Sequence, residues 1–495
     1  MEGVTPSADP ARPRTGAAVA ALSLGTLLNP LNSSMIAVAL VSLQRDFHVD
    51  VTTVTWVITS FYLASAVGQP LMGRLADRFG PRRLFLFGMV VVALACALTP
   101  FSGSFLAVCI GRVALAIGTA TAFPSAIAML RPLSARSGVQ TPRLLGRIQI
   151  ANTSGAAIGP VLGGALVTFL GWQAIFWINV PLAVLTFFGL WLFAPSAVEL
   201  RAARSDAATP APREPATEVA TKREPVPLRR TLAESDIPGI LLFVATLTSL
   251  LVFLLDLHPT PLWWLLPVTV IAGGLFAWRE LRCAHPFLDL RLLAANRRLL
   301  MIYLSFAIFN VVYYSAFFGL PQYLQTHGGY SAGVAGLLMF PLAAVTIVVT
   351  PLAARSIGAV GLRPTLLAGA GALVVGAALL GVAAVTTAPW VVLVLTAALG
   401  VPYCVVSLSM NQALYSAARP EDSGVAAGIF QTSRYVGAIV ATTVLGLLFS
   451  GGTTGSSWLT AVGVATGLAV VHLALLTFVR PRRGPADAET AGAAG

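Results

Sequence analysis

The sequence predicts an all-α membrane protein with fourteen transmembrane helices. Of its 495 residues, 57% are hydrophobic and 10% are charged, whereas a soluble domain is about 25% charged. Charge-free runs recur along the whole chain. Since one span takes roughly 20 residues, fourteen spans use about 280 and leave room for loops, tails and one linker. These observations exclude a mainly soluble protein.

Charge-free runs locate the helices, because a charge at the bilayer centre costs about 2.5–3.5 kcal/mol on insertion scales. Turns at residues 171–173, 328–329 and 387–389 divide the longest runs, since Gly and Pro favour turns. The expected spans are 17–41, 54–73, 84–101, 104–129, 148–169, 173–194, 237–256, 261–278, 299–323, 332–353, 364–385, 390–414, 423–449 and 457–479.

Arginines set the expected orientation. Fourteen spans place both ends of the chain on one side of the membrane, and positive loops mark that side as cytoplasmic. With the N-terminus inside, 28 of the 31 basic residues fall in inner segments, Arg45 lies outside, and Arg112 and Arg434 fall within spans. The uncharged run at 15–44 is longer than the apolar segment of a cleaved signal peptide. We therefore expect a multi-pass protein with a retained first span and both termini cytoplasmic, in the cytoplasmic membrane of a bacterium.

The chain divides into two halves around a polar linker. Residues 195–235 mix Ala, Pro, Thr, Glu and Arg without apolar periodicity, as solvated linkers do. Residues 73–80 line up with 351–358, so that spans 1–6 and 9–14 form repeats, the arrangement of many secondary transporters. The expected parts are a cytoplasmic tail (1–16), a six-helix half (17–194), the linker (195–235), two inserted helices with a cytoplasmic loop (236–298), a second six-helix half (299–479) and a tail (480–495).

The strongest local motif is the arginine-rich turn at residues 73–83, where Asp77 lies among four arginines. Arginines between spans can serve topology alone, because they hold a loop inside. Alternatively, the turn is a conformational latch in which Asp77 pairs with a cation or a helix N-terminus in one state and releases it in the other. The latch residues are then Gly73, Asp77, Arg78, Gly80, Arg82 and Arg83.

This turn resembles the loop 2–3 signature of the major facilitator superfamily, Gly-x-Leu-Ala-Asp-Arg-x-Gly-x-Arg, at every fixed position. Residues 155–164 resemble the antiporter motif of drug:proton exporters. Residues 171–181, 278–280 and 286–291 are similar to the fourteen-span drug:proton antiporter (multidrug efflux) branch of that superfamily. The resemblance implies the major facilitator fold, with two six-helix repeats plus two inserted helices.

The antiporter motif has a physical meaning of its own. Its glycines recur every four residues and share one helix face, which permits close helix approach, and its proline allows a bend. Close packing without any exporter role is the alternative. The motif residues are Gly155, Gly159, Pro160, Gly163 and Gly164.

Proton coupling is implied by the resemblance, but its usual carrier is missing. The branch carries an aspartate early in span 1, where this chain has Asn32, and none of the 19 acids lies at the centre of a span. Arg112 matches an arginine that the family links to proton transfer; alternatively, it binds backbone carbonyls. His472 can titrate near neutral pH, although a lone histidine in a final span is more often simply packed. The candidate coupling residues are Arg112, Asp236, Asp256 and His472.

A substrate cavity is predicted from one face of span 9 and polar residues elsewhere. Aromatic faces with a few hydrogen-bonding groups suit lipophilic ligands, although ordinary packing also produces them. No carboxylate lines this predicted cavity, so neutral or anionic lipophiles fit it better than dications. The predicted lining is Phe306, Asn310, Tyr313 and Phe317 from span 9, with Asn32, Gln149, Asn152 and Arg434.

We therefore expect an exporter of lipophilic small molecules, such as drugs, antibiotics or metabolites, that works by alternating access and proton antiport. An uncoupled facilitator or uptake carrier on the same fold is the alternative, because fold does not settle direction or substrate. An enzyme would need clustered acids and histidines or a metal site, but the five histidines are scattered. A sensor would have to signal through the linker, where no folded module is recognisable.

Other partners are not expected. The single lysine, Lys222, is outside any P-loop pattern, the four cysteines lack metal-ligand spacing, and the basic residues do not gather into a nucleic-acid surface. The expectation is a monomer that needs no cofactor or metal, with the small molecule, protons and the lipid bilayer as its partners and the proton gradient as its energy source.

Overall fold

The computed structural model describes residues 11–194, 236–255, 262–283, 286, 291, 296–418 and 423–478. In these residues the chain forms helices and turns without strands, which confirms the all-α prediction. The helices are α1 (Ala11–Phe47), α2 (Val51–Val54), α3 (Trp56–Phe79), α4 (Pro81–Leu98), η1 (Thr99–Phe101), α5 (Phe105–Ala120), α6 (Ala122–Ser137), α7 (Thr141–Leu170), α8 (Ala174–Trp177), α9 (Asn179–Phe193), α12 (Ile237–Leu255), α13 (Leu265–Arg282), α15 (Arg297–Thr326), α16 (Ala332–Leu338), α17 (Phe340–Val360), α18 (Leu362–Leu379), η2 (Leu380–Ala384), α19 (Pro389–Ala417), α20 (Ser423–Leu448) and α21 (Gly455–Phe478).

In the described part of the chain, 11 helical segments are long and apolar enough to cross a membrane. They coincide with predicted spans 1–6, 9–12 and 14. The remaining three predicted spans are helical as well, as α12, α13 and α20. The turns at Gly171, Gly329 and Ala388 lie where they were predicted. The total of fourteen spans stays a prediction, and the linker at 195–235 and the tail at 480–495 lie outside the described residues.

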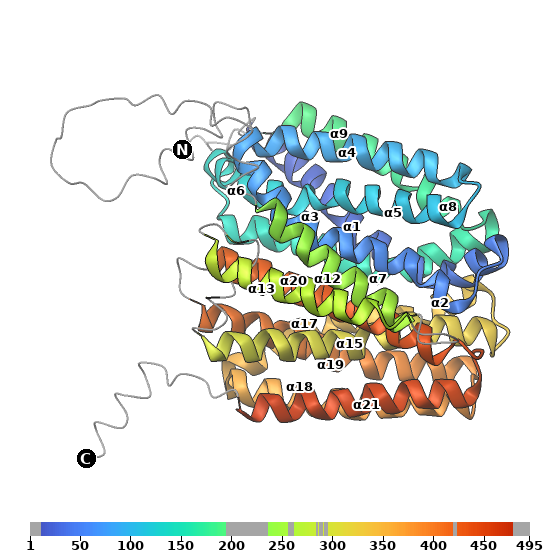
Figure 1. The fold of residues 1–495 in the computed structure, drawn as a ribbon. Helices are drawn as coiled ribbons and strands as arrows, with labels where there is room; N and C mark the ends of the chain where they lie inside the picture. Colours follow the sequence, from blue (N-terminus) through green and yellow to red (C-terminus); the bar gives the residue numbers. More distant parts are fainter. Residues whose placement is uncertain are drawn as a thin grey trace, which may run out of the picture.

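The helices run side by side in two bundles (Figure 1). Helices α1 to α9, coloured blue to green, form the first bundle, and α15 to α21, yellow to red, form the second. The inserted helices α12 and α13 pack together at the junction, where α12 contacts α3 of the first bundle and α20 of the second. The bundles meet where α7 contacts α16 and α17, where α3 contacts α20, and where α1 contacts α15. We call this junction the seam.

A repeated turn relates the two bundles. Gly80 ends α3 with φ +89°, and Gly361 ends α17 with φ +95°, a left-handed conformation that favours glycine. Two residues later, Arg82 donates to the carbonyl of Trp191 at the end of α9 (2.6 Å), and Arg363 donates to that of Thr477 at the end of α21 (3.2 Å). The alignment predicted from sequence, which pairs Gly80 with Gly358, is therefore wrong by three residues, because identity there was too slight to fix the register.

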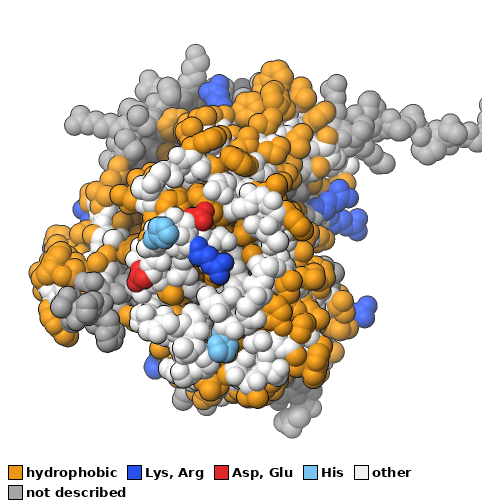
Figure 2. Space-filling model, turned by 90° about the vertical axis from the view of Figure 1, so that its right-hand side faces the viewer, with side chains coloured by type: hydrophobic (Ala, Val, Ile, Leu, Met, Phe, Trp, Pro, Cys, Tyr) orange, Lys and Arg blue, Asp and Glu red, His pale blue; other side chains and the backbone are white. Residues whose placement is uncertain are grey.

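Charge is distributed unequally between the two ends of the bundles. Arginines such as Arg83, Arg147 and Arg355 are exposed at the end where α3 turns into α4. Figure 2 views the opposite end, where polar groups occupy the middle and hydrophobic side chains surround them. The flanks carry exposed apolar side chains, including Phe87 at 60%, Phe169 at 82% and Trp390 at 71%. Lipid tails suit such flanks, since a soluble surface rarely exposes so many large apolar groups together.

We expect the arginine-rich end to face the cytoplasm. In a Cys283→Ser background, Gly103→Cys should react with a membrane-impermeant maleimide in intact cells, and Ser356→Cys only after permeabilisation. Both positions are exposed, Gly103 has open space around it, and the other three cysteines are buried. Labelling of Ser356→Cys in intact cells would contradict this orientation.

Candidate transport site

A cationic side chain lies at the seam, surrounded by tyrosines. Arg434 on α20 is partly exposed, and its Nε donates to Oη of Tyr314 on α15 at 3.1 Å. The guanidinium also interacts electrostatically with Tyr403 on α19 and with its neighbour Tyr435. Three helices of the second bundle thus converge on one positive charge.

The first bundle completes this group through α3. The ring of Tyr62 lies 5.6 Å from Tyr314, 6.2 Å from Phe318 and 5.8 Å from Tyr435, measured between ring centroids. Gln69, also on α3, donates from Nε2 to Oη of Tyr435. Both bundles therefore contribute to the site, which we call the tyrosine site and define as Tyr62, Gln69, Tyr314, Tyr403, Arg434 and Tyr435.

The predicted aromatic face of α15 is buried inside the second bundle. Phe306 stacks on Phe430 of α20 with centroids 3.7 Å apart, and Tyr313 stacks on Tyr403 of α19 at 3.9 Å. Asn310 donates to the carbonyl of Phe306 at 2.7 Å. Phe317 lies 5.5 Å from Tyr313 and is buried as well. The packing interpretation therefore fits Phe306 and Asn310, while Tyr313 and Phe317 extend the tyrosine site.

Arg112 is fully enclosed by the first bundle. Its Nε donates to the carbonyl of Val57 at 3.2 Å and its Nη1 to that of Asn32 at 3.4 Å. The guanidinium lies 4.3 Å from the ring centroid of Phe61, a cation–π contact. Nη2 has no hydrogen-bond partner among the described residues. This geometry matches the alternative in which Arg112 binds backbone carbonyls.

Asn32 is paired with an amide that the sequence analysis did not select. Nδ2 of Asn32 donates to Oδ1 of Asn179 on α9 at 2.6 Å, and Nδ2 of Asn179 donates back at 2.9 Å. Both residues are buried. The predicted contact of Asn32 with substrate stays a prediction, and it requires this amide pair to open.

Two further polar candidates lie on α7. Asn152 is partly exposed, and its Oδ1 has no hydrogen-bond partner among the described residues. The side chain of Gln149 lies outside the described part of the structure. The Asn152 side chain thus keeps a buried oxygen without a partner, and the predicted contacts of Asn152 and Gln149 with substrate stay predictions.

The antiporter motif on α7 packs against two helices, α1 and α16. Added Cβ atoms at Gly155, Gly159 and Gly163 would collide with Leu27, Ser34 and Met35 of α1, so these glycines allow α1 and α7 to approach closely. Gly164 lies against the carbonyl of Ala332 on α16, and the carbonyl of Pro160 lies against Gly336 on the same helix. The motif therefore packs one bundle together and also forms part of the seam.

Few hydrogen bonds cross the seam away from the tyrosine site. The amide of Gly333 donates to Oγ1 of Thr168 at 2.8 Å, and the hydroxyls of Thr59 and Thr442 lie 3.1 Å apart. Thr52 donates to the carbonyl of Gly446 at 3.1 Å. These bonds join the bundles near the end that holds α2 and α16.

The predicted latch is described in part. The backbone of Asp77 and Arg78 belongs to α3, but their side chains lie outside the described part of the structure. Gly73 faces Pro124 of α6, where an added Cβ would lie 3.9 Å from Cβ of the proline. Arg82 binds the carbonyl end of α9, and Arg83 is exposed. A latch through Asp77 stays a prediction.

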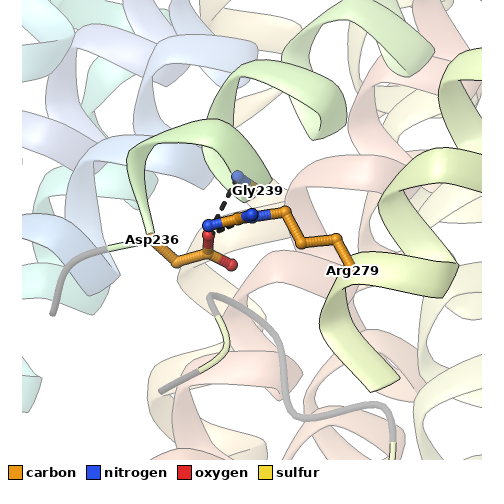
Figure 3. Close-up of polar contacts among 3 residues, drawn as sticks. All are labelled: Asp236, Gly239 and Arg279. Atoms are coloured by element: carbon orange, nitrogen blue, oxygen red, sulfur yellow. Dashed lines mark hydrogen bonds and ion pairs between the residues drawn. The ribbon is translucent and has the colours of Figure 1, made fainter. Parts of the chain in front are cut away.

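Asp236 is a buried acid at the start of α12 (Figure 3). Its Oδ1 accepts from Nε of Arg279 on α13 at 2.6 Å and from the amide of Gly239 at 3.1 Å. Oδ2 has no hydrogen-bond partner among the described residues. Glu280 is buried too, and its Oε1 would lie 2.6 Å from a Cβ on Gly239. Two carboxyl groups thus approach the same glycine.

The other coupling candidates lie elsewhere. His472 on α21 is buried, with Nδ1 2.9 Å from Oγ and from the carbonyl oxygen of Ser305 on α15. This contact places it inside the second bundle, away from Asp236. Asp256 lies outside the described residues.

Sequence reasoning missed several residues of these groups: Tyr62, Gln69, Tyr314, Tyr403, Tyr435, Asn179 and Glu280. Most are polar residues in otherwise apolar helices, and Tyr435 directly follows Arg434, so the sequence could have marked them individually as candidates. It could not show that they lie together, because they come from helices far apart in the chain.

Two helical bundles with a polar site at their junction are the architecture of many secondary transporters. The sequence model of the Major Facilitator Superfamily matches residues 22–442. The chain therefore belongs to this superfamily.

Known proteins agree with this assignment. An uncharacterized MFS-type transporter of Bacillus subtilis, YwoD, is 34% identical over 434 residues, which are 87% of this chain and 89% of the relative. The tetracenomycin C resistance and export protein of Streptomyces glaucescens is 29% identical and covers 87% of this chain and 75% of its own length. The xylose transporter XylE from E. coli, in a partially occluded inward open conformation, shares the fold with a TM-score of 0.64 at 15% identity, covering 95% of this chain and 99% of that one.

We expect Gly159→Ala to destabilise the first bundle. Its new methyl group would collide with Ser34, and overpacking of this kind costs about 1–3 kcal/mol. The melting temperature of the purified protein in detergent should therefore fall. Gly146→Ala is the matched control on the same helix, because its Cβ meets nothing within 4 Å. Equal melting temperatures for the two variants would refute close packing at Gly159.

Proposed function

We propose that this protein is a secondary active transporter that exports lipophilic small molecules from the cytoplasm by alternating access, driven by proton antiport. The observation that carries the proposal is the tyrosine site, because it is built from both bundles at the seam. A ligand held there touches both bodies that move in alternating access, so its binding can bias their arrangement.

The substrate class is supported by the composition of the site. Aromatic rings supply apolar contact, while Gln69 and Arg434 supply hydrogen-bond donors. Such a mixture suits lipophilic molecules that carry a few polar groups. A relative named as a tetracenomycin C resistance and export protein supports the direction of transport.

Asp236 is the proton carrier that we propose. It is a buried carboxylate with one unpartnered oxygen among the described residues, and a proton carrier needs a group that can gain and lose a proton in the membrane. It lies at the start of α12, which contacts both α3 and α20. These two helices also hold Tyr62 and Arg434, so α12 connects Asp236 to two helices of the tyrosine site.

An uncoupled facilitator is the second candidate. It is favoured by Asn32, which replaces the usual acid and is engaged by Asn179 in a pair of amide hydrogen bonds that cannot exchange protons. The remaining proposals about the setting are a monomer in a bacterial cytoplasmic membrane with both termini in the cytoplasm. Protons and the lipid bilayer are the partners.

Everted membrane vesicles test the main proposal. We expect neutral or anionic lipophiles to accumulate in vesicles that contain the protein, and accumulation to disappear when an uncoupler collapses the pH gradient. Vesicles without the protein are the control. Carrier-dependent equilibration that ignores the gradient would instead support the facilitator, and no carrier-dependent flux in either direction would refute transport of these compounds.

We expect Asp236→Asn to remove coupling while leaving the carrier able to move its substrate. Gradient-driven accumulation should fall to the level of wild-type vesicles treated with uncoupler, whereas equilibration should persist. Arg279→Gln is the matched control, because it breaks the same ion pair and keeps the carboxyl group. If both variants lose coupling equally, the ion pair is what matters, and Asp236 is not the proton carrier.

A further inference from the structure

We propose that the tyrosine site selects aromatic anions, namely planar molecules bearing a carboxylate or a phenolate. This inference rests on the proposed function and specifies its substrate class. Its first ground is the positive charge of Arg434 at the seam.

Arg434 has no acidic partner among the described residues. Phenols surround it: Nε donates a hydrogen bond to Oη of Tyr314, and Tyr403 and Tyr435 are near enough to interact with it electrostatically. In the sequence, none of the 19 acids lies in the middle of a predicted span. A positive charge inside a membrane protein is costly unless it is paired or faces water. An anionic ligand would supply the missing counter-charge.

The guanidinium has donors to spare for such a ligand. Nε is used by Tyr314, while Nη1 and Nη2 have no protein hydrogen-bond partner in the described part of the structure. The side chain is partly exposed, so these donors can be reached. Two adjacent N–H groups of arginine match the two oxygens of a carboxylate, which gives charge-assisted hydrogen bonds in a fixed geometry.

The rings around Arg434 favour an aromatic ligand. Tyr403 is partly exposed, and its ring stacks on Tyr313 with centroids 3.9 Å apart. Tyr62, Tyr314 and Tyr435 are buried. The ring centroid of Tyr62 lies 5.6 Å from that of Tyr314 and 5.8 Å from that of Tyr435. A planar ligand can extend this stack, because aromatic pairs gain energy beyond area burial when their rings are offset or edge-to-face.

The same charges disfavour cations. Arg434 at the seam and Arg112 inside the first bundle both repel a positive ligand, and neither forms an ion pair with an acid in the described residues. A like charge brought into a site of low dielectric is strongly unfavourable. The site therefore discriminates by charge as well as by shape.

Three probes of one shape and different charge test this inference: 2-naphthoate, 2-naphthamide and 2-naphthylmethylammonium. Their binding to the purified full-length protein in nanodiscs is measured by equilibrium dialysis at pH 7.4. We expect the anion to bind at least about tenfold more tightly than the amide, since a hydrogen bond to a charged group contributes about 1.5–3 kcal/mol, and the cation to bind most weakly. Equal binding of the three probes, or tighter binding of the cation, would overturn the inference without any variant.

Variants then assign the selectivity to residues. Arg434→Gln should lower the affinity for the anion more than the affinity for the amide, and so remove the preference for the anion. Tyr403→Leu should weaken all three probes, because it removes a ring and no charge. Arg355→Gln is the matched control, since Arg355 is an exposed arginine of the same bundle outside the site. If Arg434→Gln keeps the preference for the anion, the charge at the seam is not its source.

Failure of this inference differs from failure of the proposed function. Binding is measured without a gradient, so anion preference can hold even if vesicles show no proton-coupled export. Conversely, vesicles that export the amide or the ammonium probe as well as the naphthoate would support the transporter and refute its selectivity for anions.

Discussion

Inside a bilayer, each polar side chain must find its partner within the protein, because lipid tails offer none. Several buried polar residues of this protein follow that constraint. Asn32 and Asn179 satisfy each other, Arg112 binds the carbonyls of Val57 and Asn32, and His472 meets Ser305. Each of these contacts joins helices of a single bundle. The polar residues of the spans thus fix each bundle as a body.

Close approach of helices also holds each bundle together. Helices in a membrane associate through packing of small residues and through hydrogen bonds, since the hydrophobic effect does not drive them together there. The glycines of α7 allow contact with α1 on one face and with α16 on another. The seam itself has few hydrogen bonds. Among the described residues the two bundles pack closely at the seam, yet most side-chain hydrogen bonds stay within one bundle. This distribution suits a transporter in which one bundle rocks against the other.

Arg434, which is partly exposed, differs from these buried polar groups. It is held by phenols from its own bundle, and those phenols contact Tyr62 of the other bundle. A charge satisfied only by neutral hydroxyl groups can accept a stronger partner, because charge-assisted hydrogen bonds exceed neutral ones. This difference makes the seam, and not the interior of either bundle, the place where a ligand gains most by binding.

The sequence by itself determined the class of the protein. Charge-free runs gave the positions of the helices, because charges are excluded from the bilayer centre, and the motif at 73–83 indicated the family. Only the tertiary structure decided which polar residues meet. Asn32 looked like a cavity residue until Asn179, 147 positions away, engaged its amide. Tyr62 and Tyr435 belong to one site although they lie in opposite halves of the chain. Hydropathy records whether a residue enters the membrane, but helix rotation and packing decide which neighbour it faces there.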